Sequence, residues 1–237
     1  GILSGLIATF IYQIFVRMYD KWRFRSKLWY PFLKDSTIIT YGVWQNNYIG
    51  KGDLWPILIP LVTIWTYGSQ INKNQIPLKQ ANDCNVSDRE NNNLILIGGP
   101  ASNSLITEAL NGTNIQYNKI TDDNYSIVAN GTTYQRSEDT PNGLLIDYGV
   151  CVLRRSPWNN NKWVLSISGT SSYASEGIAK FIRNLAELKR LTNYMRLNEA
   201  ISLAIVLKTT FKNQCYVQSE IVFSLYKKKE WWEWLKK

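Results

Sequence analysis

The sequence predicts an α/β fold, with a mostly parallel β-sheet and helices on both faces, preceded by an N-terminal transmembrane helix. Two observations predict the sheet. Apolar stretches run directly into glycine turns at Tyr41-Gly42, Gly98-Gly99-Pro100 and Ser168-Gly169-Thr170, and a helical segment follows each turn. Strands that alternate with helices form largely parallel sheets. A third observation, an uncharged N-terminal stretch beside a basic and aromatic cluster, predicts the membrane helix.

The N-terminal stretch, residues 1–16, is apolar except for three polar side chains. A membrane span needs about 20 apolar residues, so we assign residues 1–20 to a single transmembrane anchor. Residues 21–36 then form a basic juxtamembrane segment, which the positive-inside rule places in the cytoplasm. The expected localisation is the cell membrane, single-pass, with a cytoplasmic soluble domain. The alternative for the N-terminal stretch is a buried amphipathic helix.

The C-terminal tail, residues 227–237, combines three tryptophans with five lysines. This mixture suits the headgroup layer of a membrane, where indole rings are half-buried and ammonium groups face anionic lipid. The alternative is a terminal strand docked on the domain. The side chains expected to contact lipid are Arg17, Lys21, Trp22, Arg23, Arg25, Trp231, Trp232 and Trp234.

The α/β domain is expected to span residues 37–226, and its first strand ends at Gly42. Residues 54–67 are almost uniformly apolar and predict a helix that covers one face of the sheet. The alternative is a second membrane segment, although the stretch is short for one. Residues 93–97 predict a strand buried on both faces, because four large apolar residues follow one another there. Residues 104–110 predict the next helix.

The second half of the domain is expected to hold hairpins, two long strands, one helix and a closing pair of strands. Three Asn-Gly pairs within residues 111–143 favour tight hairpin turns. Apolar residues at three- and four-residue spacing, from Ile178 to Leu188, predict a helix over residues 177–191. The strands are expected at residues 144–153, 162–169, 202–209 and 216–226.

In a parallel sheet the strand-to-helix turns share the carboxyl edge, where open α/β folds bind their ligands. Glycine turns leave backbone N–H groups uncovered, and helix N-termini attract anions. We therefore expect one crevice that binds a nucleotide-like anion, with no metal. The alternative is a set of tight turns without a ligand. The expected ligand-binding residues are Gly42, Gly52, Asp53, Gly98, Gly99, Asn103, Ser168, Gly169, Thr170 and Ser171.

The composition excludes several kinds of chemistry within this chain. Its 237 residues include no histidine and carry a formal net charge of +9. The lack of histidine rules out Ser–His and Cys–His catalysis and histidine-ligated metals. Cys84, Cys151 and Cys215 show no metal spacing, so we expect reduced, structural cysteines. The basic clusters flank the domain and no nucleic-acid motif is present, so direct nucleic-acid binding is not expected.

Short motifs in the domain resemble a known family. The order IGGPxxN at 97–103, DYG at 147–149, SPWN at 156–159 and VLSISGT at 164–170 is similar to a poorly characterised Rossmann-like domain. That domain occurs in bacterial membrane-anchored proteins and is related to a domain of archaeal surface-layer-type proteins. The resemblance covers roughly residues 37–226 and implies a Rossmann-like fold with a ligand edge. It implies no particular reaction.

Three functions follow from these expectations. The first is a membrane-anchored sensor or effector, in prokaryotic defence or stress signalling, that binds a nucleotide-like ligand or a partner protein at the glycine edge. The second is a hydrolase of nucleotide glycosidic bonds that uses Glu176 and Asp53; otherwise these residues are a helix-dipole carboxylate and a helix N-cap. The third is a non-catalytic structural or interaction module. The expected partners are membrane lipid and a partner protein or second copy of the chain.

Overall fold

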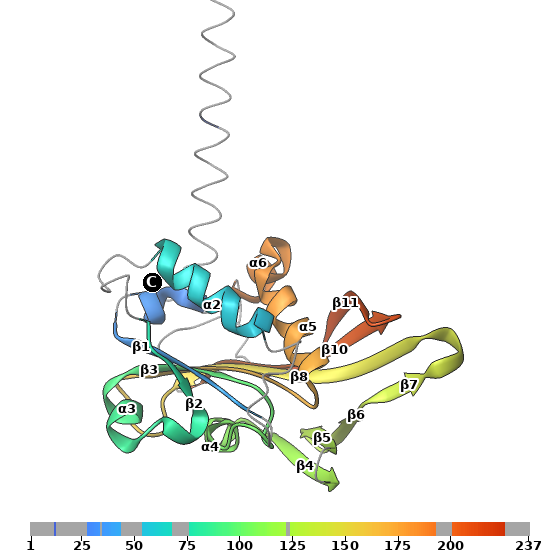
Figure 1. Cartoon of the computed structure of the whole chain (residues 1–237), viewed down its shortest axis with the longest axis horizontal. Coiled ribbons are helices and arrows are strands. Elements are labelled where there is room, and N and C mark those ends of the chain that lie inside the picture. The colour runs from blue at the N-terminus through green and yellow to red at the C-terminus, as the bar shows by residue number, and fades with distance from the viewer. Residues whose placement is uncertain are drawn as a thin grey trace, which may run out of the picture.

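The computed structural model of the chain describes residues 12, 28–33, 35–43, 54–67, 76–121, 124–192 and 201–225. The strands of its larger sheet are β1 (Thr37–Tyr41), β2 (Leu78–Gln80), β3 (Asn93–Ile97), β7 (Ser137–Asp139), β8 (Leu144–Arg155), β9 (Trp163–Gly169), β10 (Ile201–Lys212) and β11 (Cys215–Leu225). Their order is β11-β10-β8-β9-β3-β1-β2, and β7 pairs with β8 (Figure 1). A smaller sheet is formed by β4 (Ile115–Thr121), β5 (Asn124–Ala129) and β6 (Thr132–Gln135).

Helices and the smaller sheet cover the two faces of the larger sheet (Figure 1). One face carries α2 (Leu54–Tyr67), α5 (Ser172–Arg183) and α6 (Leu185–Thr192), together with the helical residues 28–33. The other face carries α4 (Leu105–Leu110) and the smaller sheet. The remaining helices are α3 (Val86–Asn91) and the 3₁₀ turns Ala81–Asp83 and Thr140–Asn142.

The strand directions overturn the predicted fold class. Strands β2, β1, β3 and β9 are parallel to one another. The pairs β9–β8, β8–β10 and β10–β11, as well as β7–β8, are antiparallel. The sheet is therefore mixed, and strands predominate in the described residues. The prediction of a mostly parallel, Rossmann-like sheet is wrong.

Short connections explain why half of the sheet is antiparallel. The segment between β8 and β9 is a compact turn, in which the Ser156 N–H donates to the Lys162 carbonyl at 2.8 Å. A parallel crossover needs a dozen or more residues, so this turn forces β8 and β9 to run in opposite directions. The turn between β10 and β11 consists of Asn213 and Gln214, with φ values of 50° and 64°. Two left-handed residues in a row form the tight turn that joins antiparallel strands.

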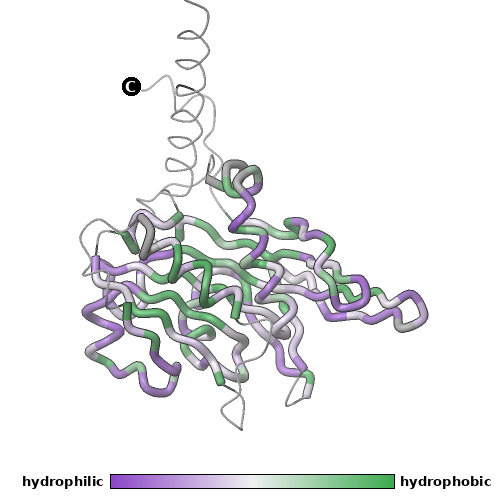
Figure 2. The backbone as a smooth tube through the Cα atoms, turned by 45° about the horizontal axis from the view of Figure 1, so that its top comes forward, coloured by the Kyte–Doolittle hydropathy of each residue, from purple (hydrophilic) through white to green (hydrophobic). Residues whose placement is uncertain are grey.

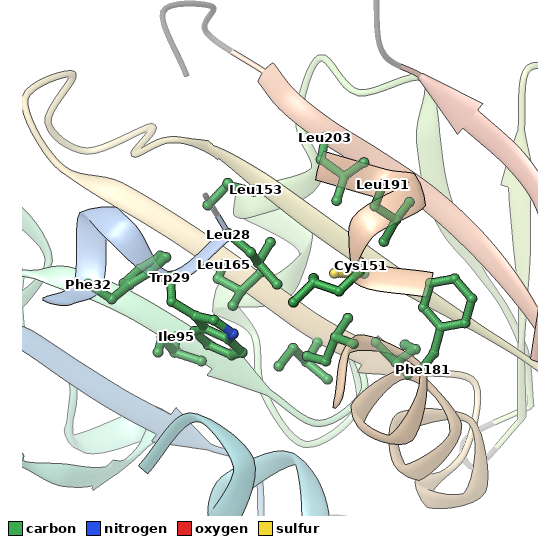
Figure 3. Packing of buried hydrophobic residues seen from close by; sticks show 14 of the residues in the cluster. Leu28, Trp29, Phe32, Ile95, Cys151, Leu153, Leu165, Phe181, Leu191 and Leu203 are labelled. Carbon is green, nitrogen blue, oxygen red and sulfur yellow. The ribbon is translucent and has the colours of Figure 1, made fainter. Parts of the chain in front are cut away.

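The core consists of two apolar clusters, one on each face of the larger sheet. Along β3, Ile95 and Ile97 belong to the cluster under α2 and α5, whereas Leu94 and Leu96 belong to the cluster beside α4. Figure 3 shows the first cluster, with Trp29, Leu165 and Phe181 among its labelled side chains. Figure 2 shows hydrophobic stretches in the middle of the strands and hydrophilic stretches in the loops. The expectation that β3 is buried on both faces is confirmed.

No helix within the described ranges is both long and apolar enough to cross a membrane. This finding overturns the predicted single-pass arrangement, the membrane localisation and the alternative that residues 54–67 form a second span. Helix α2 has 14 residues. The residues expected to contact lipid lie outside the described residues, as do residues 227–237 and, apart from Tyr12, residues 1–20.

The three cysteines give a direct test of this fold. Cys84 and Cys151 are buried, whereas Cys215 is exposed. Burial raises the pKa of the Cys84 thiol and raises the pKa of Cys151 to about 12. Because the thiolate is the reactive form, we expect a thiol reagent at about pH 8 to modify Cys215 rapidly in the native protein and the other two cysteines only in denaturant. Rapid native modification of a second cysteine, identified by peptide mass, would contradict the packing described here.

Candidate functional site

The carboxyl ends of β1, β3 and β9 meet at one edge of the larger sheet. The register pairs Tyr41 with Ile97, and Ile97 with Ile167. Beyond the strand ends, the Gly42 N–H donates to the Ile97 carbonyl at 3.1 Å, and the Gly98 N–H donates to the Ile167 carbonyl at 3.3 Å. The structure thus brings these predicted glycine turns together, because the three strands concerned are parallel.

The glycines at this edge lie too close to neighbouring turns for a side chain. A Cβ atom on Gly42 would lie 2.5 Å from Ser102 Cβ, and one on Gly98 would lie 2.9 Å from Ser102 Oγ. A Cβ atom on Gly99 would lie 2.9 Å from the Gly169 carbonyl oxygen. Gly98 also has a φ of 115°, which residues with a side chain rarely adopt. Contact between the turns therefore accounts for these glycines without a ligand.

Asn103, one of the expected ligand-binding residues, is fully buried and hydrogen-bonded within the fold. Its Nδ2 donates to the Ile97 carbonyl at 3.1 Å and to Thr40 Oγ1 at 3.3 Å. Its Oδ1 accepts from the Leu105 N–H at 3.2 Å. The side chain therefore joins the ends of β1 and β3 to the first turn of α4.

A buried carboxylate on β8 accepts hydrogen bonds from the turn that joins β9 to α5. Asp147 on β8 is 0% exposed. It accepts hydrogen bonds from the hydroxyls of Thr170 and Ser171 and, at 2.8 Å, from the Tyr148 N–H. Ser171 is also the N-cap of α5, where its Oγ accepts from the Tyr173 N–H at 3.2 Å. Because helix N-termini favour negative charge, the anion expected at this turn is supplied by the chain itself.

Two further polar side chains, Ser168 and Tyr117, extend the set of polar residues around Asp147 toward the smaller sheet. The Tyr117 hydroxyl donates to Ser168 Oγ at 3.0 Å, and Ser168 Oγ donates to the Val150 carbonyl at 3.5 Å. Burial raises the pKa of Tyr117 above its usual range; the bond to Ser168 opposes this shift, and the charge of Asp147 adds to it. Tyr117 therefore stays protonated at neutral pH and acts as a donor that ties β4 to β9.

Of the two predicted catalytic carboxylates, the described residues include Glu176 alone. Glu176 on α5 forms an ion pair with Lys180 at 2.5 Å. The Lys180 ammonium nitrogen lies 4.8 Å from the centre of the Tyr216 ring on β11, so the ion pair lies on the side of α5 toward that strand. Gly52 and Asp53 lie outside the described residues.

Helix α2 carries an exposed surface that was not predicted from the sequence. One face of this helix is buried on the sheet side through residues such as Ile57 and Thr63. Along the other face lie large apolar side chains that are between 40% and 54% exposed, namely Leu54, Trp55, Leu58 and Val62. A surface helix normally carries polar residues on its exposed face. The signal in the sequence is that residues 54–67 contain no charged residue on any face.

A groove of about 420 Å³ lies between α2 and the C-terminal end of α5. It is lined by Trp29, Trp55, Leu58, Ile59, Val62, Thr63, Ile182 and Arg183. The Arg183 guanidinium carbon lies 5.7 Å from the centre of the Trp55 ring, a cation–π distance. The Thr63 hydroxyl is used within the helix, where it donates to the Ile59 carbonyl at 2.6 Å. The groove therefore offers mainly apolar surface and one cation.

Together these features define a mostly β domain with a mixed sheet, in which side chains of the chain itself fill the glycine edge and an apolar groove is exposed. No known protein-family profile matches the chain, and no curated protein matches it significantly. The predicted relationship to the Rossmann-like domain therefore rests on the short sequence motifs alone. Within the described part of the chain, no group of three or more His, Cys, Asp or Glu side chains is placed to hold a metal ion.

Proposed function

We propose that this chain is a non-catalytic interaction module that binds a partner protein in the groove between α2 and α5. The observation that carries this proposal is the row of exposed apolar side chains along α2, which includes Leu54, Trp55, Leu58 and Val62. Large exposed apolar patches on folded proteins mark interaction sites. A helix that is apolar on every side is ordinarily buried on every side, so a partner would complete the burial of α2.

The composition of the groove supports a protein partner. Trp55 and Arg183 line it with exposed side chains, and tryptophan and arginine are enriched among the residues that dominate binding energy at protein interfaces. Lysine, aspartate and glutamate, which are depleted in interface centres, are absent from its described lining. Of the side chains that line the groove, Ile182 is buried, whereas Trp55, Leu58 and Val62 are exposed.

The other functions considered have less support in the geometry. A nucleotide phosphate at the β9–α5 turn would meet the buried carboxylate of Asp147, which already accepts the hydrogen bonds of Thr170 and Ser171. A glycosidic hydrolase needs two carboxylates across one bond, and Glu176 is engaged by Lys180. The interaction module needs neither arrangement.

A labelled amphipathic peptide tests the proposal. The probe is a helix of about 18 residues with leucines at i, i+3, i+4 and i+7 and glutamine elsewhere on its surface. We expect saturable binding to the full chain, measured by fluorescence anisotropy, and at least about tenfold weaker binding to the Val62→Asp variant, because a carboxylate there would be desolvated by the peptide. Thermal melting checks that the variant is folded.

Val86→Asp is the matched control for this experiment. Val86 lies on α3 and is 59% exposed, close to the 54% exposure of Val62 on α2. The control should bind the peptide like the unmodified chain, because α3 does not line the groove. Absence of saturable binding, or equal loss in both variants, would contradict the proposal.

A further inference from the structure

We infer that the partner presents an acidic amphipathic helix, whose apolar side enters the groove and whose carboxylate pairs with Arg183. This inference rests on the proposed function and names the chemistry of its partner. Three observations support it: the exposed apolar row on α2, the environment of Arg183 and the charge of the chain.

The exposed apolar side chains described on α2 give room for a bound helix. The residues from Leu54 to Val62 extend about 12 Å along the axis of α2. This is close to two helical turns, the distance over which a bound helix presents anchors at i, i+3, i+4 and i+7. The groove runs between two helices, α2 and α5, which is the usual setting for helix-in-groove binding.

Arg183 supplies the charge that the partner would meet. It lies in the last turn of α5, with an exposed side chain that stacks on Trp55 at 5.7 Å. Within the described part of the chain, no carboxylate forms an ion pair with Arg183, and no other charged side chain lines the groove. An arginine held on an aromatic ring keeps its N–H donors available for a carboxylate in a bidentate geometry.

The charge of the whole chain favours an acidic partner over a second copy. The formal net charge is +9, so two copies repel each other while an acidic partner is attracted. In a two-fold symmetric contact the same patch meets itself, which would bring two Arg183 side chains toward each other. The inferred occupant is therefore a different protein with a negatively charged helix.

Binding measurements with peptides of opposite charge test this inference. The leucine-bearing peptide is made with either glutamate or lysine beside its leucines, and the glutamine peptide serves as the neutral reference. We expect the glutamate peptide to bind the full chain about fivefold more tightly than the lysine peptide at low salt. The difference should shrink in about 0.5 M NaCl, because salt screens exposed charges. The Arg183→Glu variant should reverse the preference and bind the lysine peptide more tightly.

Lys212→Glu is the control for net charge, because it makes the same charge change at an exposed position on β10. It should leave the preference for the glutamate peptide unchanged. If the glutamine peptide binds and loses affinity with Val62→Asp, but glutamate and lysine peptides bind equally, this inference is wrong and the proposed function stands. If no peptide binds, the proposed function itself fails.

Two further outcomes would overturn the inference in favour of another occupant. Light scattering could show a dimer that Val62→Asp dissociates, which would assign the groove to a second copy. Alternatively, the chain could bind vesicles of neutral phosphatidylcholine through Val62 and ignore all three peptides, which would assign the groove to lipid.

Discussion

Replacing Asp147 with alanine is expected to lower the free energy of unfolding by about 4 kcal/mol, because it removes three hydrogen bonds to a buried carboxylate and each hydrogen bond to a charged group contributes roughly 1.5–3 kcal/mol. The carboxylate is 0% exposed. Its removal would take this acceptor from the partly buried hydroxyls of Thr170 and Ser171 and from the Tyr148 N–H, and would leave the Thr170 hydroxyl only its bond to the Tyr148 carbonyl at 3.2 Å. Urea denaturation of the full chain, followed by tryptophan fluorescence, measures the effect.

Two controls separate the role of the Asp147 charge from side-chain loss in general. Asp139→Ala removes an exposed aspartate that accepts one bond from Asn142 at 2.6 Å, and it should change stability by no more than about 0.5 kcal/mol. Asp147→Asn retains one acceptor oxygen and should cost less than Asp147→Ala. If Asp147→Ala and Asp139→Ala are equally stable, the buried carboxylate does not hold the β9–α5 turn.

Asp147→Ala also tests whether the turn is an anion site that the chain fills for itself. The vacated space lies at the N-terminus of α5, beside the hydroxyls of Thr170 and Ser171. Added formate should therefore restore part of the lost stability in this variant and leave the unmodified chain unaffected. An equal response of both proteins would mean that formate acts on the solvent and not at the turn.

The parallel half of the sheet and the closing pair of strands β10 and β11 were accessible from the sequence, whereas the direction of β8 relative to β9 was not predicted correctly. Residues 93–97 and 163–169 are apolar runs bounded by turn residues, and both are buried strands. The error lies in extending the β–α alternation past residue 143. The turn at 156–162 is too short for a crossover, so the predicted turn already implied that the flanking strands are antiparallel.

The sequence indicated which turns lie together. It did not indicate which groups of the chain fill the space between them. Glycine positions can be located in the sequence, but the contact between Gly99 and Gly169 depends on how the turns pack. Asp147 carries a usable signal, since it is the one charged residue within the apolar run from Leu144 to Leu153. A charged residue in such a run must find buried partners, and the hydroxyls of the neighbouring turn supply them.

The exposed face of α2 could not have been predicted from residues 54–67 alone. Their uniform apolar character leaves no polar stripe that would identify the outer face. The outer face is decided by neighbours, because α5 packs along one side of α2 and leaves Leu58 and Val62 exposed on another. Such packing is a property of the assembled fold. Because of it, a helix that was predicted to be buried exposes one face, which is a candidate interface.

Gly169→Ala is expected to lower the free energy of unfolding of the domain by more than an ordinary glycine substitution does. A Cβ atom there would lie 2.7 Å from both Ala174 Cβ and the Ser175 backbone nitrogen, and 2.5 Å from the Ser171 carbonyl oxygen. These atoms belong to the first turn of α5 and the residue before it, and backbone cannot move aside like a flexible side chain. Overpacking in a well-packed region costs roughly 1–3 kcal/mol, and backbone contacts place this variant at or above about 3 kcal/mol.

Gly112→Ala is the control for glycine loss without crowding. Gly112 has a φ of 79°, and nothing lies within 4 Å of a Cβ atom built there, so its cost should be about 1–2 kcal/mol of backbone strain. If the glycines of the sheet edge serve packing, Gly169→Ala should lower the melting temperature well below that of Gly112→Ala. If they serve a ligand instead, Gly169→Ala should melt like the unmodified chain, and ligand binding would return as the explanation of this edge.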